Sequence, residues 1–259
     1  MMGDELGERE PARPVMLVTG GSRGIGAATA RLAAQRGWDV CVNYVRDRAS
    51  AEAVVADVER EGGRGLAVAA DVSREDEVAR LFAAMDEALG PVAALVNNAG
   101  ILERQMRVEE MTADRLARVF VANVTSCFLC ARQAVLRMST KRGGRGGAIV
   151  NVSSAASRLG SPGEYVDYAA SKGAVDSLTI GLAQEVAAEG IRVNAVRPAF
   201  IYTDIHASGG EPGRVDRVKA NVPLRRGGHP EEVARAILWL ASDESSYSTG
   251  TFIDVSGGK

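Results

Sequence analysis

The sequence predicts an α/β fold in which a doubly wound parallel sheet carries helices on both of its faces. Short apolar runs alternate with longer amphipathic segments along the whole chain, which is typical of βαβ units. The glycine-rich segment Thr19–Gly26 follows the first apolar run and opens the first amphipathic segment. Glycines also stand where amphipathic segments should end, at Gly37, Gly62-Gly63, Gly90 and Gly190.

The apolar runs predict seven strands, each followed by turn residues or by the start of an amphipathic segment. These strands are Val15–Val18, Asp39–Tyr44, Leu66–Ala69, Ala94–Asn97, Ala148–Val152, Arg192–Val196 and Phe252–Val255. The amphipathic segments between them predict helices over Ile25–Arg36, Ala49–Glu61, Arg74–Leu89, Ala113–Ser139, Tyr168–Glu189 and Pro230–Ser242. The one long irregular stretch is Ala199–Gly228. Because segments of this kind are usually binding loops or lids, we expect the substrate loop at about residues 199–228.

Composition and charge describe an ordinary soluble protein, since 46% of the 259 residues are hydrophobic and 25% are charged. We expect one domain over residues 14–259 and a disordered polar tail over residues 1–13. The formal net charge of −2 and the pI near 5.9 offer no electrostatic reason to expect a nucleic acid or an anionic membrane as partner. No apolar run approaches the about 20 residues needed to span a bilayer, so no membrane association is predicted.

The three cysteines predict packing rather than chemistry. Cys41, Cys127 and Cys130 are an odd number in apolar surroundings, as expected for reduced thiols of a cytoplasmic protein. Although Cys127 and Cys130 form a C-x-x-C, they lie in a long apolar helical run. No Cys/His cluster has zinc spacing, and His206 and His229 lack a second ligand nearby in the sequence, so no metal site is expected.

The segment Tyr168-Ala169-Ala170-Ser171-Lys172 places a phenol and an ammonium on one face of a helix. A phenol has an unperturbed pKa of about 10, and an adjacent fixed cation favours the phenolate. Such a pair can transfer a proton to or from a carbonyl or alcohol oxygen. Tyr168 and Lys172 are therefore candidate catalytic residues, although an exposed Tyr and Lys one turn apart also occur by chance.

The segment Thr19–Gly26 predicts a dinucleotide site, because the order strand, glycines, helix lets the backbone approach a pyrophosphate at a helix N-terminus. Its spacing, G-x-x-x-G-x-G, departs from the common G-x-G-x-x-G. The second glycine run, Gly143–Gly147, precedes a strand instead of a helix. It is therefore predicted to be only a flexible loop.

The end of the second predicted strand favours NADP over NAD. NAD-binding domains usually carry an acid there that accepts hydrogen bonds from the adenosine ribose. This chain has no acid until Asp47, whereas Arg23 and Arg46 are suited to pair with a 2′-phosphate. NAD remains possible, and in that alternative Arg46 is a solvated surface charge.

The motifs along the chain resemble those of the short-chain dehydrogenases/reductases. They are, in order, Thr19–Gly26, Asn97-Asn98-Ala99-Gly100, Asn123, Ser153-Ser154, Tyr168–Lys172, Arg197-Pro198, Thr249-Gly250 and Gly257-Gly258. The resemblance covers nearly the whole chain and is nearest to glucose 1-dehydrogenase-like and 3-oxoacyl-acyl-carrier-protein reductase-like members. It implies a seven-stranded Rossmann-type sheet, an NAD(P) cofactor and catalysis by Asn, Ser, Tyr and Lys.

The resemblance also implies a role for each catalytic residue. Tyr168 exchanges a proton with the reacting oxygen, and Lys172 favours the phenolate and holds the nicotinamide ribose. The backbone carbonyl of Asn123 anchors a water beside Lys172, with a satisfied core asparagine as the alternative. Ser154 hydrogen-bonds the substrate oxygen.

Three serines are candidates for this role, because Ser153, Ser154 and Ser157 all follow the fifth predicted strand. Family members usually place it thirteen residues before the tyrosine, where this chain has Ala155. A one-residue insertion and the Val152-Ser153-Ser154 motif favour Ser154. The chain also departs from the family at Pro198-Ala199, where Pro-Gly is common.

Further cofactor contacts follow from the predicted fold. We expect Asp71 and Val72 at the adenine, the segment Asn98–Gly100 at the adenosine ribose, and Thr203 at the nicotinamide carboxamide or pyrophosphate. The full set of predicted cofactor residues is Gly20, Ser22, Arg23, Gly24, Ile25, Gly26, Asn43, Tyr44, Arg46, Asp71, Val72, Asn98, Ala99, Gly100, Tyr168, Lys172, Pro198, Ile201 and Thr203.

Taken together, these features predict an NADP(H)-dependent enzyme that interconverts a small-molecule secondary alcohol, or sugar hydroxyl, and a carbonyl. Two alternatives remain. One is an NAD(P)-binding sensor without turnover, which usually lacks part of the catalytic set. The other is a sugar-nucleotide epimerase or dehydratase, which generally has a larger C-terminal domain. A homotetramer is expected from the family, and the apolar and small residues of Val119–Val135 and Ala174–Val186 are compatible with it.

Overall fold

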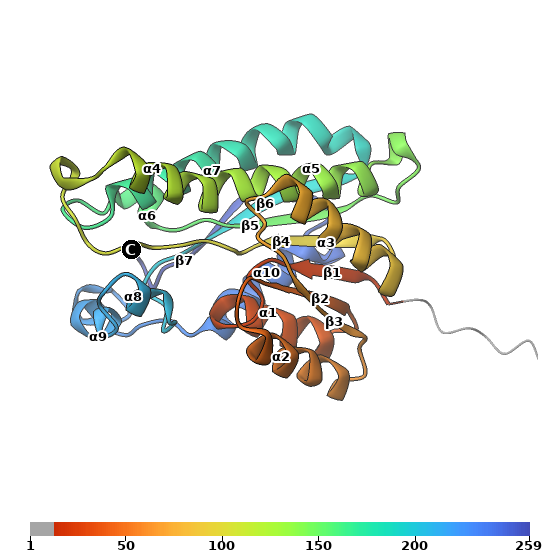
Figure 1. The fold of residues 1–259 in the computed structure, drawn as a ribbon, viewed down its shortest axis with the longest axis horizontal. Coiled ribbons are helices and arrows are strands. Elements are labelled where there is room, and N and C mark those ends of the chain that lie inside the picture. The colour runs from red at the N-terminus through yellow and green to blue at the C-terminus, as the bar shows by residue number, and fades with distance from the viewer. Residues whose placement is uncertain (1–12) are drawn as a thin grey trace, which may run out of the picture.

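Seven parallel strands form one sheet between two layers of helices in the computed structural model, which describes residues 13–259 (Figure 1). Their order is β3-β2-β1-β4-β5-β6-β7. The bounds are β1 Val15–Val18, β2 Asp39–Tyr44, β3 Gly65–Ala69, β4 Val92–Asn97, β5 Gly147–Val152, β6 Ile191–Pro198 and β7 Phe252–Val255. This confirms the predicted Rossmann-type fold class. The predicted tail falls outside the described residues except for Arg13.

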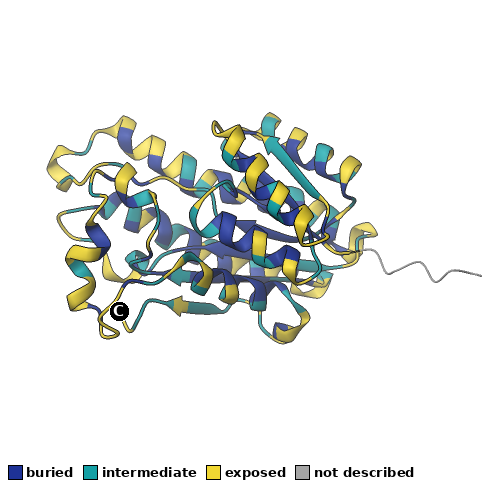
Figure 2. Ribbon diagram, turned by 90° about the horizontal axis from the view of Figure 1, so that it is seen from below, coloured by how far each residue is buried: buried dark blue, intermediate teal, exposed yellow. Residues whose placement is uncertain are grey.

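The strands are apolar along their whole length because helices cover both faces of the sheet. In β1, Met16 and Val18 enter one core cluster, whereas Val15 and Leu17 enter the cluster on the opposite face. All four side chains are buried. Figure 2 shows the same arrangement, with buried strands inside and the exposed residues on the outer sides of the helices.

Six long helices cover the sheet as predicted. One face carries α1 Gly24–Gln35, α2 Arg48–Arg60 and α10 Pro230–Ala241, and α1 packs against both of the others. The other face carries α3 Glu75–Ala88, α5 Ser126–Met138 and α7 Val166–Val186, with α4 Ala113–Phe120 continuing that layer (Figure 1). The side chains of Asp47 and Thr112 cap α2 and α4 by accepting backbone N–H bonds.

The predicted single helix Ala113–Ser139 is not regular. Five residues of π-helix, Val121–Thr125, separate α4 from α5, and α5 ends at Met138. A π-turn adds one residue and so offsets the apolar face by one position. Because residues 120–130 are apolar at most positions, this single offset leaves no clear mark in the sequence periodicity.

The segment Ala113–Met138 also contradicts the expectation that no segment is apolar enough to span a membrane. By length and composition alone, Ala113–Met138 would qualify. Within the fold, however, α5 packs on β4 and α3, and α4 packs on α7. These contacts account for part of its apolar surface, and the rest stays exposed.

The composition of the substrate loop predicted an irregular segment, but the structure shows short helices in it. It contains α8 Ile205–Ser208, α9 Arg214–Val218 and a 3-10 turn at Lys219–Asn221. Each piece is too short for a periodic signal in the sequence. The same applies to α6 Ala156–Leu159 and to the 3-10 turns Val108–Glu110, Thr140–Arg142, Ala187–Glu189 and Asp243–Ser245.

The three cysteines are free and buried, which confirms the prediction that they serve in packing. Burial raises the pKa of the Cys41 thiol to about 12, and it also raises the pKa of Cys127 and Cys130. These thiols are therefore protonated and unreactive near neutral pH.

Candidate active site

The predicted nucleotide loop lies where the strand order reverses, between β1 and β4. The amide of Asn98, just after β4, donates to the carbonyl oxygens of Thr19 (2.9 Å) and Gly20 (3.0 Å). In return, the Thr19 hydroxyl oxygen accepts the backbone N–H of Asn98 and of Ala99, each at 3.0 Å. These bonds join the loops that follow two neighbouring strands at the position where open α/β sheets bind ligands.

The glycine-rich segment Gly20–Gly26, called the glycine cradle below, lets backbone groups approach a ligand closely. Gly20 and Gly24 have positive φ angles of 60° and 53°, which favour glycine. A Cβ on Gly26 would lie 2.5 Å from the carbonyl oxygen of Gly20, and one on Gly24 would lie 3.4 Å from Cγ2 of Thr203. Within residues 13–259, no side chain caps the N-terminus of α1, so its first-turn N–H groups are free for a phosphate. The cradle fits a dinucleotide.

Asn43 has a structural role that the sequence did not reveal. Its Oδ1 accepts the backbone N–H of Gly20 (3.2 Å), and its Nδ2 donates to the carbonyl oxygens of Val68 (3.3 Å) and Ala70 (2.9 Å). The buried amide therefore ties the nucleotide loop to β2 and β3. We expect Asn43 to support cofactor binding by holding this loop.

The end of β2 carries exposed arginines and an acid that is engaged elsewhere. Asp47 accepts both the backbone N–H of Ser50 (3.0 Å) and its hydroxyl (2.6 Å). These bonds, and then the charge of Arg23, hold the pKa of Asp47 below its usual value. Arg23 and Arg46 are exposed, and neither has a carboxylate partner in the part of the chain that the structure describes.

The other predicted cofactor residues stand on the same edge of the sheet. Asp71, after β3, forms a turn in which its Oδ1 accepts the backbone N–H (3.0 Å) and hydroxyl (2.7 Å) of Ser73. Half-buried residues of the set are Ser22, Ile25, Asp71, Asn98, Ala99 and Thr203, and buried ones are Tyr44, Val72, Pro198 and Ile201. Their contacts with a cofactor remain predictions.

Tyr168 and Lys172 share one face of α7, as their spacing predicts. The ammonium lies 5.6 Å from the centre of the Tyr168 ring and donates a hydrogen bond of 2.8 Å to the Val152 carbonyl oxygen. Lys172 is buried, and Tyr168 is half-buried. A Cβ on Gly100 would lie 3.6 Å from Lys172 Nζ and 3.1 Å from Asn123 Oδ1, so the ends of β4, α7 and the π-turn converge here.

Asn123 is fully buried in the π-helical segment, and its side chain holds two other segments. Its Oδ1 accepts the backbone N–H of Ile101 (2.7 Å), and its Nδ2 donates to the Ile101 carbonyl (3.1 Å) and to Ser171 Oγ (3.1 Å). Its backbone carbonyl accepts a bond from Cys127 Sγ (3.3 Å). The amide is therefore a satisfied buried group that links the loop after β4 to α7.

The geometry distinguishes the candidate serines. The Ser153 hydroxyl is buried and donates to Asp176 Oδ1 (2.6 Å). Ser154 is half-buried, and its Oγ accepts the backbone N–H of Ala156 (3.1 Å). Ser157 donates to the carbonyl oxygen of Ser154 (2.8 Å). The Ser154 hydroxyl itself donates only a long bond of 3.4 Å to the Pro198 carbonyl oxygen. Because this bond is long and Ser154 is half-buried, the hydroxyl can turn toward a substrate oxygen, which favours Ser154 over Ser153.

Several charged residues that surround this site gave no signal in the sequence. Arg115 and Asp167 form a buried ion pair (2.7 Å) beside Tyr168. In the substrate loop, Arg214 bonds to Glu164 and Arg217 bonds to Glu211, and this contact holds the pKa of Glu211 at about 2. The Arg115–Asp167 and Arg214–Glu164 pairs join residues 52 and 50 positions apart, so residue spacing could not reveal them, whereas Arg217–Glu211 is a local pair within the substrate loop.

The predicted absence of a metal site rested on the two histidines. His206 is buried and bonds the Ile201 carbonyl through Nε2 (3.0 Å), and burial lowers its pKa. Over residues 13–259, no group of three His, Cys, Asp or Glu side chains is placed to hold a metal ion.

The arrangement can perform proton exchange at an oxygen beside a bound dinucleotide. A half-buried phenol lies next to a buried ammonium, and a serine hydroxyl stands at the end of the neighbouring β5. The phenol can give or take a proton, and the serine can stabilise negative charge on a substrate oxygen.

Comparison with known proteins agrees with this arrangement. A family model described as enoyl-(acyl carrier protein) reductase matches residues 20–259. The chain is 63% identical to the uncharacterised oxidoreductase YgfF of Escherichia coli K12, over 95% of this chain and 99% of that protein. It is 40% identical to a 3-oxoacyl-[acyl-carrier-protein] reductase of Synechocystis, over 94% and 96% of the two chains. A reductase of the same name from Staphylococcus epidermidis is 37% identical, over 93% and 97%.

The Tyr168→Phe variant tests the proton-exchange assignment. Turnover should fall by at least ~100-fold, because a positioned acid/base contributes about that much, while cofactor affinity stays nearly unchanged. Lys172→Met should reduce both turnover and cofactor affinity. Steady-state kinetics and cofactor titration of the purified variants measure the two effects, and wild-type turnover in Tyr168→Phe would refute the assignment.

The adjacent serines form a matched pair for a second test. Ser154→Ala should lower kcat by roughly 10- to 1000-fold, as expected when a donor to the reacting oxygen is lost, without a large change in melting temperature. Ser153→Ala should instead lower the melting temperature, because Oδ1 of the buried Asp176 loses this hydrogen-bond donor, while Oδ2 keeps its bonds to Arg197. The opposite pattern in kinetics and calorimetry would assign the catalytic role to Ser153.

Proposed function

Because the chain belongs to the short-chain dehydrogenase/reductase family and is an NAD(P)-dependent oxidoreductase, we propose that it interconverts a ketone and a secondary alcohol with NADP(H). The observation that carries this proposal is the convergence of Tyr168, Lys172 and the Asn123 side chain beside the glycine cradle. Such a set suits proton exchange at the oxygen of a C–O bond whose carbon changes oxidation state.

In the reductive direction, the chain's own residues act on the substrate oxygen. Ser154 donates a hydrogen bond that stabilises developing negative charge, and Tyr168 delivers the proton. Lys172 compensates the phenolate that remains. Gly20, Gly24 and the N-terminus of α1 would hold the pyrophosphate, and Lys172 the nicotinamide ribose. When bound, the nicotinamide supplies or accepts the hydride.

The preference for NADP rests on charge at the end of β2. Asp47 is occupied in capping α2, so the acid nearest to this strand does not face a ribose as a free acceptor. The backbone N–H of Gly21, two residues before Arg23, donates to the carbonyl oxygen of Asn43 (2.8 Å), three residues before Arg46, so the nucleotide loop lies against the end of β2. Exposed guanidinium groups on these two segments favour a 2′-phosphate.

For the substrate, the names of two relatives favour carbonyl compounds of the 3-oxoacyl type. A panel of sugars, polyols, steroids, β-keto esters and 3-oxoacyl thioesters, followed at 340 nm with both cofactors, tests this proposal. We expect turnover of β-keto compounds with NADPH. No turnover across the panel would favour the sensor alternative, and isomerised or dehydrated sugar-nucleotide products would favour an epimerase or dehydratase.

The cofactor preference gives a charge-based prediction. If Arg23 and Arg46 both bind the 2′-phosphate, each contact contributes on the order of 1.5–3 kcal/mol, so Arg46→Ala should weaken NADP binding by roughly 10- to 150-fold. NAD binding should change little, and Tyr44→Asp should shift preference toward NAD by adding repulsion. Dissociation constants for both cofactors measure this. Equal losses for NADP and NAD would mean that Arg46 only supports the loop.

We also propose a homotetramer, because the long helices of one layer leave apolar side chains uncovered. Leu116, Phe120, Val121 and Phe128 are exposed on the α4–α5 run, and Ile180 is exposed on α7. Symmetric pairing would cover them. Light scattering at micromolar concentration should give a tetrameric mass, and Phe128→Glu should lower it. A monomeric mass for the wild type would contradict the proposal.

A further inference from the structure

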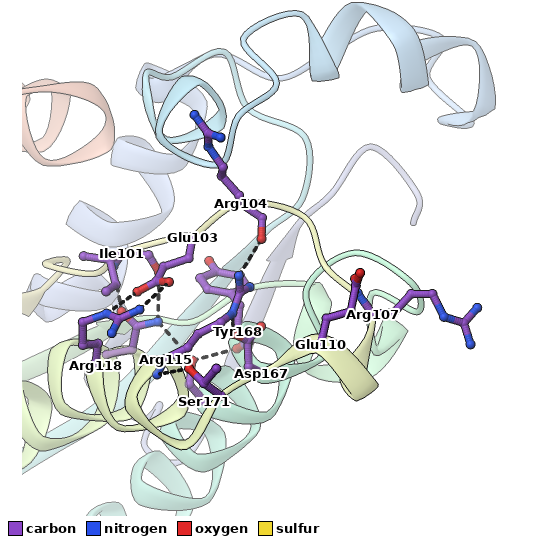
Figure 3. Close-up of polar contacts among 12 residues, drawn as sticks. Ile101, Glu103, Arg104, Arg107, Glu110, Arg115, Arg118, Asp167, Tyr168 and Ser171 are labelled. Carbon is purple, nitrogen blue, oxygen red and sulfur yellow. Dashed lines mark hydrogen bonds and ion pairs between the residues drawn. The ribbon is translucent and has the colours of Figure 1, made fainter.

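Both peptide groups of Tyr168 are hydrogen-bonded by side chains. Its N–H donates to Asp167 Oδ1 (2.9 Å), and its carbonyl accepts the hydroxyl of Ser171 (2.7 Å). Asp167 in turn pairs with Arg115 of α4, and Ser171 bonds Asn123 of the π-turn. The backbone of Tyr168 is therefore held at both ends from the α4 and π-helical segments. Figure 3 shows Arg115, Asp167 and Ser171 gathered around Tyr168.

The Arg115–Asp167 pair is almost completely buried, with 4% and 3% of the two residues exposed. Arg115 Nε donates to Asp167 Oδ2 (2.7 Å), and a second guanidinium nitrogen donates to the backbone carbonyl of Arg104 (2.7 Å). Its remaining terminal nitrogen is buried without a hydrogen-bond partner among residues 13–259. One guanidinium thus connects the loop after β4, α4 and the first turn of α7.

Stability does not explain this pair. Burying two charges is costly, and apolar residues of similar volume usually give equal or greater stability. The same loop and helix are also joined by Glu103 and Arg118, which form a largely exposed pair (2.8 Å). What the buried pair adds is a fixed direction, because a planar guanidinium bonds both a carboxylate and a carbonyl in one geometry.

The first turn of α7 needs such support. Tyr165, at the N-cap, makes no side-chain capping bond, and Tyr168 is the third residue of the helix. First-turn N–H groups have no intrahelical acceptor, so they depend on side chains or water. Asp167 satisfies the N–H of Tyr168, and Arg115 in turn fixes the carboxylate that does so.

The loop held by Arg115 also contacts the substrate loop. A Cβ on Gly209 would lie 2.9 Å from Leu102, and one on Gly210 would lie 3.4 Å from Cγ of Arg104. Figure 3 shows the Arg104 side chain extending from its carbonyl away from Arg115. Arg115 therefore connects the position of Tyr168 to the segment that packs against the substrate loop.

We propose that Arg115 and Asp167 are positioning residues of the active site: their buried ion pair sets where the Tyr168 hydroxyl stands relative to the substrate oxygen. This role rests on the proposed function, in which Tyr168 exchanges the proton. Neither residue touches the substrate. The pair acts through the backbone of Tyr168 and the loop after β4.

The decisive variant removes both charges. Arg115→Met and Asp167→Asn each leave one buried charge unpaired and should destabilise the fold, whereas the double variant leaves none. The double variant should fold with a melting temperature near that of the wild type and bind NADPH with unchanged affinity. Its kcat should fall roughly 10- to 100-fold, as expected for a small displacement of a reacting group, with KM changed less than kcat.

Arg118→Met is the matched control, because it removes an arginine from the same helix and breaks a bond to the same loop. The ion pair that Arg118 forms with Glu103 is largely exposed, so kcat and melting temperature should stay close to those of the wild type. Arg115→Lys keeps the positive charge but not the planar guanidinium that bonds two acceptors. Its kcat should lie between those of Arg115→Met and the wild type.

Hydrogen exchange gives a readout that does not depend on turnover. The Tyr168 amide should exchange faster in the double variant than in the wild type or in Arg118→Met. A double variant with wild-type kcat and wild-type exchange would overturn the positioning role, as would a kcat loss matched by equal losses in cofactor affinity and stability. If the wild type turned over nothing in the panel, the proposed function would fail. The exchange measurement would still test whether Arg115 and Asp167 hold the backbone of Tyr168.

Discussion

The reversal of strand order between β1 and β4 is the constraint on which the site depends. Chains leaving the carboxyl ends of these two strands diverge to opposite faces of the sheet, and the space between them must be lined by backbone that still finds hydrogen-bond partners. Asn98 and Thr19 satisfy that backbone across the gap, and Asn43 secures it from β2. These three side chains fix the backbone of the glycine-rich loop in place.

On the other side of the gap, buried polar side chains hold the segment that carries Tyr168. Asn123, Ser171, Asp167 and Arg115 form a chain of bonds between the α4–α5 run and α7. Such groups are expensive to bury, and only near-complete satisfaction makes them tolerable. Their cost is concentrated around one residue, Tyr168. Positional control of a reacting group is a sufficient physical reason for a polar network where apolar packing would be simpler.

The cofactor end of the site follows a different principle, because its charged groups are exposed. Asp47 is held by Ser50 at the start of α2, which satisfies a helix terminus and at the same time withdraws the acid from the nucleotide space. The arginines beside it keep their positive field. Under the proposed preference for NADP, this local capping bond leaves arginines rather than a free acid near the adenosine ribose.

The sequence by itself determined the sheet, the main helices and the chemistry. Strands buried on both faces must be apolar throughout, helices end at glycines, and the Tyr168–Lys172 spacing places both groups on one face because α-helical geometry is local. The predicted Ala113–Ser139 helix was wrong in its middle, since the one-residue offset of the π-turn at Val121–Thr125 is hidden where most positions are apolar. The substrate loop contains helices too short to predict. Only the tertiary structure decided that Ser153 faces Asp176, that Asn43 holds the cradle and that Arg115 meets Asp167. Each of these depends on residues between 23 and 52 positions apart, whose contact is set by packing of whole elements and leaves no pattern in the chain.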